Sequence, residues 1–136
     1  MKPSLVQGIA STARFEIDRP RTIDFLGESL RIYATPSLVL DVESACRQLL
    51  LAHLDPGQDS VGTRVELDHL AATPLGMTVE LGVSVIEVKG RAITFAFEGH
   101  DGVDTICRGM HRRHVIEIDA ARERLAAKAH RGAGSR

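Results

Sequence analysis

The sequence TPSLVLDVESACRQLL, which spans residues 35–50, decides the fold of this protein. Its apolar side chains recur at helical spacing and form a wide stripe, while polar side chains occupy the other face. Thr35 before Pro36 is typical of a helix start, with Thr35 as the N-cap residue and the proline at the first helical position. Asp55-Pro56-Gly57 has the composition of a turn. The stretch therefore predicts one long helix with a buried face.

Downstream of this helix, side chains alternate with the period of two that is typical of β-strands. Lys89-Gly90 and Asp101-Gly102 predict hairpin turns between such strands. These signals predict a meander of about four long strands, over residues 60–69, 77–85, 93–97 and 103–118. In the first strand, we expect one inward face made of Val61, Thr63, Val65, Leu67 and His69.

The two ends of the chain carry weaker signals. Upstream of the helix, residues 13–17 and 22–26 predict short strands, and residues 27–33 fit either a loop or a short helix. Downstream of the meander, we expect a short helix over residues 120–129, with Asp119 as its N-cap. We expect residues 1–128 to form a single domain and residues 129–136 to be a disordered tail.

This order of elements is an α+β pattern, in which helices lie on one face of an antiparallel sheet. A long central helix wrapped by an antiparallel sheet of about five strands describes a hotdog fold. Because a lone sheet leaves its edge strands exposed, we also expect the protein to be dimeric.

Composition excludes several classes of function. The 136 residues include 17 basic and 18 acidic side chains and only 4% aromatic ones, so the chain lacks the basic surface and stacking rings of nucleic-acid readers. No apolar stretch is long enough for a signal peptide or a membrane span. We therefore expect a cytoplasmic protein without nucleic-acid or membrane partners, with Cys46 and Cys107 buried and reduced.

Three polar residues stand out because each has a structural and a functional interpretation. Glu43 is flanked at helical spacing mostly by apolar residues, so it is either a surface partner of Arg47 or a partly buried carboxylate that needs another partner. His69 is either a hydrogen-bonded histidine at the edge of the core or a general base. The Thr35 hydroxyl either caps the helix or helps to hold an oxyanion.

Other candidate sites carry less weight. His111 and His114 are three residues apart in a predicted strand and would face opposite sides, so we expect no metal site. No phosphate-binding or nucleophile-elbow motif is present in the sequence. Arg112 and Arg113 are expected at a solvated strand edge, from which one of them could reach a phosphate or a carboxylate.

The chain contains a set of motifs with characteristic spacing, which are Ala34-Thr35-Pro36, Glu43, Ser60-Val61-Gly62-Thr63, His69 to Pro74, Gly99 to Asp104 and Gly109 to Arg113. Together these motifs resemble the fluoroacetyl-CoA thioesterase family of hotdog proteins. The resemblance covers about residues 15–118, and its spacing holds as well as its residue types, with eight residues from Thr35 to Glu43 and 26 from Glu43 to His69.

The resemblance implies a homodimeric acyl-CoA thioesterase, in which coenzyme A enters as part of the substrate and no other cofactor is needed. It implies that Thr35, His69 and Glu43 form the catalytic set, and that Gly62 and Arg113 contact the substrate. The best-known type of member has a phenylalanine-rich lid before the Ala-Thr motif. Here residues 25–33 contain only Phe25 and Tyr33 as aromatics, so we expect a short or small-substituent acyl group without assigning fluoroacetyl.

The residues leave the reaction route open. His69 would accept a proton from water or from Thr35, and Glu43 would either orient His69 or attack the thioester carbonyl itself. The alternative function is a non-catalytic hotdog module that binds acyl-CoA or a related small molecule, and an enoyl-thioester hydratase is a further rival.

Overall fold

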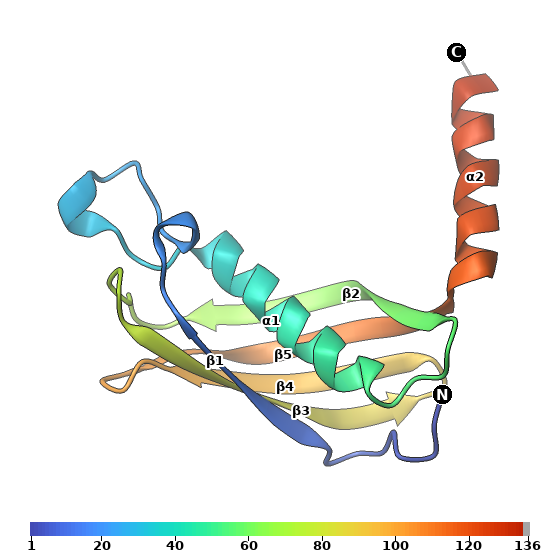
Figure 1. The fold of residues 1–136 in the computed structure, drawn as a ribbon, viewed down its shortest axis with the longest axis horizontal. Coiled ribbons are helices and arrows are strands. Elements are labelled where there is room, and N and C mark those ends of the chain that lie inside the picture. Colours follow the sequence, from blue (N-terminus) through green and yellow to red (C-terminus); the bar gives the residue numbers. More distant parts are fainter. Residues whose placement is uncertain (135–136) are drawn as a thin grey trace.

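Five antiparallel strands form one sheet in the order β1-β3-β4-β5-β2 in the computed structural model, which describes residues 1–134 (Figure 1). The predicted meander is confirmed, and Gly90 and Gly102 adopt φ values of 60° and 87° in its turns. This left-handed backbone suits glycine, which has no Cβ. The strands are β1 (Ala10–Glu16), β2 (Gln58–His69), β3 (Thr78–Lys89), β4 (Ala92–His100) and β5 (Thr105–Glu117).

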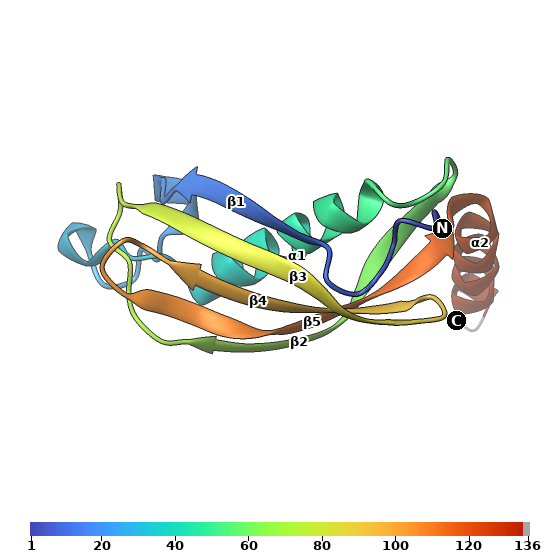
Figure 2. The ribbon, with the colours of Figure 1, turned by 90° about the horizontal axis from the view of Figure 1, so that it is seen from below.

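The predicted central helix, α1 (Thr35–Leu51), lies along one face of this sheet (Figure 2). Its buried stripe is the one predicted from the spacing, and it packs on the alternating face of β3 and on Ile93, Phe95 and Phe97 of β4. Cys46 and Cys107 are both free and buried in this core, as expected. The buried helix residues are Leu38, Val42, Cys46, Leu49 and Leu50.

The segment before α1 differs from its prediction. Residues 22–26 do not form a strand, because Thr22 makes only a single β-bridge with Tyr33. The chain then reverses at Gly27, whose φ is 84°, and continues into a short 3₁₀ helix at Glu28–Leu30. The segment therefore forms a loop that projects beyond the N-terminal end of α1 (Figure 1).

Strand β2 contains a β-bulge between Gly62 and Arg64, where its pairing with β5 shifts. The extra residue reverses the alternation, so Ser60 is buried before the bulge, and Val65, Leu67 and His69 face inward after it. Val61 was predicted to face inward, but it is 47% exposed. A regular alternation across the whole strand was therefore the wrong prediction.

The last helix, α2 (Ile118–Gly134), begins directly after β5 and projects away from the sheet (Figure 1). It starts one residue before the predicted N-cap, so Asp119 lies inside its first turn. Residues 129–134, predicted as a disordered tail, continue the helix, and the rest of that predicted tail lies outside the described residues. No helix among residues 1–134 is both long and apolar enough to cross a membrane.

Candidate active site

The hydroxyl of Thr35 lies at the N-terminus of α1, where it forms a hydrogen bond with His69. The distance between Thr35 Oγ1 and His69 Nδ1 is 2.7 Å. The N-cap residue is Ala34, which makes Thr35 the first helical residue, and no side chain caps the helix. The predicted N-cap role of Thr35 is therefore wrong, because its oxygen is directed to the end of β2.

His69 is arranged as a neutral imidazole. Tyr33 packs edge-on against its ring at a centroid distance of 6.2 Å. Burial lowers the pKa of His69 below its usual value near 6.5, so the ring is uncharged at neutral pH. Its Nε2 is buried and has no hydrogen-bond partner among residues 1–134, so Nδ1, which faces Thr35, is the nitrogen that can exchange a proton.

A pocket of about 440 Å³ opens beside the Thr35–His69 pair. Its walls are mostly apolar and include the loop before α1, with Phe25 75% exposed at the rim. The N-terminus of α1 places the positive end of the helix dipole at this pocket, where it can stabilise negative charge on a carbonyl oxygen. The lining residues are Ile23, Phe25, Leu26, Ile32, Tyr33, Thr35, His69, Leu70, Ala71 and Ala72.

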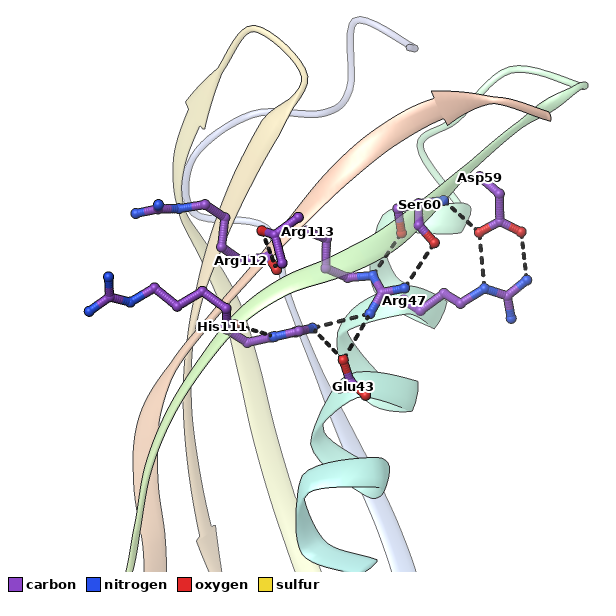
Figure 3. Close-up of polar contacts among 9 residues, drawn as sticks. Glu43, Arg47, Asp59, Ser60, His111, Arg112 and Arg113 are labelled. Carbon is purple, nitrogen blue, oxygen red and sulfur yellow. Dashed lines mark hydrogen bonds and ion pairs between the residues drawn. The ribbon is translucent and has the colours of Figure 1, made fainter. Parts of the chain in front are cut away.

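Glu43 belongs to a second group of polar residues, in the middle of α1. Its Oε1 lies 3.9 Å from His111 Nε2 and 3.9 Å from Arg113 Nη1, both on β5 (Figure 3). The alternative surface pair with Arg47 is not formed, because Arg47 makes two hydrogen bonds of 2.9 and 2.6 Å to Asp59. Glu43 is therefore partly buried beside a cation.

Arg113 lies in the interior, against the prediction of a solvated edge. Its Nε donates to Ser60 Oγ at 2.7 Å and its Nη2 donates to the Ser60 carbonyl oxygen at 2.9 Å. His111 is fully buried next to it, while His114 is exposed, as predicted for residues three apart on a strand. Alternation along β5 was the missed signal, because His111 and Arg113 share their face with the buried Val115.

Gly62 is the close neighbour of this group from β2. A Cβ atom at Gly62 would overlap Glu43 Oε1 and would lie 3.2 Å from His111 Cε1. A shallow pocket of about 320 Å³ opens here, and both Gly62 and Arg113 line it. Its lining residues are Leu40, Glu43, Ser44, Arg47, Ser60, Val61, Gly62 and Arg113.

The five predicted site residues thus form two groups within one chain. Thr35 contacts His69, while Glu43 lies with Gly62 and Arg113. Thr35 and Glu43 are eight residues apart on α1, which is about 12 Å along a helix axis. Among residues 1–134, no cluster of three or more histidine, cysteine, aspartate or glutamate side chains could hold a metal ion.

Comparisons with known proteins agree with this architecture. A family model described as fluoroacetyl-CoA-specific thioesterase matches residues 17–119. The chain belongs to this thioesterase family. Within the family, it is 32% identical over 135 residues to the fluoroacetyl-CoA thioesterase of Streptantibioticus cattleyicolor, covering 94% of this chain and 97% of that protein.

Solved structures place the fold among the hotdog proteins. A single-substitution variant of the fluoroacetyl-CoA-specific thioesterase superposes with a TM-score of 0.85 at 30% identity, covering 93% of this chain and 99% of that one. A hot-dog-like protein from Thermanaerovibrio acidaminovorans gives a TM-score of 0.83, with 93% of both chains covered. At 22% identity, the second likeness concerns the fold alone. The predicted α+β hotdog fold is confirmed.

Proposed function

We propose that this protein is a cytoplasmic enzyme that hydrolyses the thioester of a short or small-substituent acyl-CoA, with Thr35, His69 and Glu43 as its catalytic residues. The observation that carries this proposal is the 2.7 Å hydrogen bond between Thr35 and His69 at the N-terminus of α1. A hydroxyl, a neutral imidazole and a helix N-terminus around one apolar pocket are the groups that acyl transfer to water requires.

The reaction is the addition of an oxygen to the thioester carbonyl, followed by loss of the thiol. The backbone N–H groups at the N-terminus of α1 polarise the carbonyl oxygen, while the Thr35 hydroxyl donates its hydrogen to His69 Nδ1, which takes the proton of the attacking group, either Thr35 itself or water. The carbon–sulfur bond then breaks, and the proton passes to the sulfur of coenzyme A. The oxygen gained by the acid comes from water, either directly or by hydrolysis of an ester formed first on Thr35 or of a mixed anhydride formed first on Glu43.

The distance along α1 supports a homodimer in which each site uses Glu43 of the partner chain. Glu43 of the same chain is about 12 Å along the helix from Thr35, which is too far for both to act on one carbonyl carbon. Glu43 lies near the free edge of β2, beside Leu40 and Val61, which are 62% and 47% exposed. A second copy docked on this edge would cover these apolar side chains and bring in its own carboxylate.

The partially exposed pocket beside Gly62 and Arg113 is the place for a further part of the substrate. Both residues line it, although Arg113 is only 5% exposed and gives two of its hydrogen bonds to Ser60. Any contact of Arg113 with an anionic group of acyl-CoA is therefore made by the remaining guanidinium N–H groups.

The first test is thiol release from a panel of acyl-CoAs by the wild type and by His69→Ala. We expect turnover of short acyl-CoAs and a loss on the order of 100-fold in the variant. Full turnover by His69→Ala would remove His69 from the catalytic set. Saturable binding of every acyl-CoA without thiol release would instead establish the non-catalytic binding module.

Mixed dimers test the shared site. Thr35→Val and Glu43→Gln chains with different affinity tags are co-expressed, and dimers that carry both tags are purified. If the partner supplies Glu43, one of the two sites is intact and each mixed dimer keeps about half of the wild-type turnover. If each site uses its own Glu43, the mixed dimers are as inactive as the parent variants.

A further inference from the structure

His111 is a buried histidine at the centre of the Glu43 group, and the proposed catalytic set does not use it. Its Nδ1 lies 2.8 Å from the carbonyl oxygen of Arg64, at the β-bulge of β2. A carbonyl oxygen only accepts, so Nδ1 carries the hydrogen. Its Nε2 lies 3.1 Å from Arg113 Nη1, which only donates, so Nε2 presents its lone pair. These two partners fix a neutral ring in a single tautomer.

Arg113 Nη1 therefore has two acceptors within reach. It is 3.1 Å from His111 Nε2 and 3.9 Å from Glu43 Oε1. A charge-assisted hydrogen bond between a guanidinium and a carboxylate is normally about 2.8 Å long. The guanidinium is thus bonded to the neutral ring and is held about 1 Å short of a hydrogen bond with the carboxylate.

We propose that His111 is a positioning residue that holds Arg113 back from Glu43, which leaves the Glu43 carboxylate beside a cation but free to act on the substrate. This inference rests on the proposed catalytic role of Glu43. An unopposed pair would close into a direct salt bridge, and a carboxylate oxygen that accepts such a bond is a poorer nucleophile or base.

Around Arg113 and Glu43, His111 is the acceptor that competes with Glu43 for the Nη1 hydrogens of Arg113. Ser60 accepts hydrogen bonds from the other two guanidinium nitrogens of Arg113, Nε and Nη2, and these bonds fix that side of the guanidinium group. The next charged residues, Arg47 and Asp59, bind each other (Figure 3). Without an acceptor at the Nε2 position, Nη1 would have Glu43 as its nearest acceptor on the neighbouring helix.

Two substitutions separate the two nitrogens of the ring. In asparagine, the oxygen and nitrogen of the side-chain amide are the same number of bonds from Cβ as Nδ1 of histidine. In glutamine, these amide atoms are the same number of bonds from Cβ as Nε2 of histidine. His111→Asn keeps a donor for the Arg64 carbonyl and loses the acceptor for Arg113. His111→Gln keeps the acceptor for Arg113 and loses the donor. The two variants have similar polarity, so each is the control of the other.

The experiment measures kcat and KM for thiol release, thermal stability, and the crystal structure of each variant. We expect kcat of His111→Asn to fall about tenfold at little-changed KM, and His111→Gln to recover most of it, although the glutamine variant is the less stable of the two. In the His111→Asn crystal structure, Arg113 Nη1 should move to about 2.8 Å from Glu43 Oε1.

The outcomes are decisive because a structural role predicts the opposite order. If His111 only ties β5 to the Arg64 carbonyl, His111→Asn keeps both stability and activity and His111→Gln loses them, which overturns the proposal. An unchanged 3.9 Å separation in His111→Asn also overturns it. If both His111 variants keep their activity and Glu43→Gln also keeps full turnover, the proposed catalytic role of Glu43 is wrong. In that case, the distance between Arg113 Nη1 and Glu43 Oε1 in the crystal structure still tests whether His111 positions Arg113.

Discussion

Gly62 faces Glu43 so closely that a Cβ atom on the glycine would occupy the space of the carboxylate oxygen. Replacing Gly62 with alanine should therefore push Glu43 out of its position between β2 and β5. We expect Gly62→Ala to lower kcat for thiol release at least tenfold, which corresponds to about 1.4 kcal/mol in the activation free energy. Steady-state kinetics on the preferred acyl-CoA measure this loss.

Gly82→Ala is the matched control for this substitution. Gly82 lies in β3, and its added Cβ would meet no atom closer than the Glu98 carbonyl oxygen at 3.8 Å. We expect this variant to keep wild-type kcat. Equal kinetics for the two variants would show that the space beside Glu43 has no catalytic value.

The Thr35 hydroxyl should be needed for turnover, because it shares a hydrogen bond with the proposed base. Thr35→Val removes the hydroxyl with little change in shape, and we expect turnover to fall by one to two orders of magnitude. Thr35→Ser keeps the oxygen within reach of His69 Nδ1 and should keep most of the activity. A valine variant with wild-type kcat would leave His69 to act on water without Thr35.

The apolar rim of the pocket beside Thr35 should affect substrate binding more than chemistry. Phe25 lines this pocket and is 75% exposed. We expect Phe25→Ala to raise KM severalfold with little change in kcat, because contact with the acyl part of the substrate is lost equally in ground and transition states.

Leu30→Ala serves as its control, since Leu30 is 49% exposed in the same loop and does not line the pocket. Kinetic constants that change alike in both variants would indicate a general effect on the loop. A change in kcat rather than KM for Phe25→Ala would place the ring in the transition state.

Stability should fall as the pH drops below about 6.5. Burial lowers the pKa of both His69 and His111, and the nearby Arg113 cation lowers that of His111 further. Both rings therefore stay neutral in the folded protein at a pH where the unfolded chain already binds protons, at an unfolded pKa near 6.5. The stabilisation is complete above this pKa and is lost as the pH falls from about 6.5 towards the folded pKa values.

Urea unfolding at pH 7.5 and pH 5.5 would measure this dependence. We expect a lower midpoint at pH 5.5 for the wild type, and a smaller difference for a variant with both His69→Gln and His111→Gln. His114→Gln, at an exposed position of β5, is the control and should keep the wild-type difference. An unchanged difference in the double variant would mean that other groups cause the dependence.

Much of the fold could be predicted because local patterns determine it. The alternation in β3 and β4 and the spacing of α1 each reflect one buried face, and the hairpin glycines reflect backbone that other residues rarely adopt. The strand predicted for residues 22–26 is absent, because this segment has no neighbouring strand to pair with and makes only one β-bridge, at Thr22.

The site depends on contacts that local patterns do not contain. Thr35 is a good N-cap by sequence, but its hydroxyl partner lies 34 residues away at His69. The Glu43–Arg47 pair, one of the two interpretations of Glu43, is not formed, because Arg47 bonds to Asp59 on another element. Arg113 is charged and looks solvent-directed, yet Ser60 and His111 satisfy it in the interior.

The bulge in β2 makes the site sensitive to chain length at one place. Ser60 and Gly62 on one side of it and His69 on the other all face the helix, although an even alternation would put Gly62 and His69 on opposite faces. Deleting Thr63 would remove the bulge and leave an even ladder in which both sets still face the helix, whereas an inserted residue would add a second one without a partner on β5. In evolution or engineering, this strand should therefore tolerate the loss of its bulge residue more readily than a further insertion at the same place.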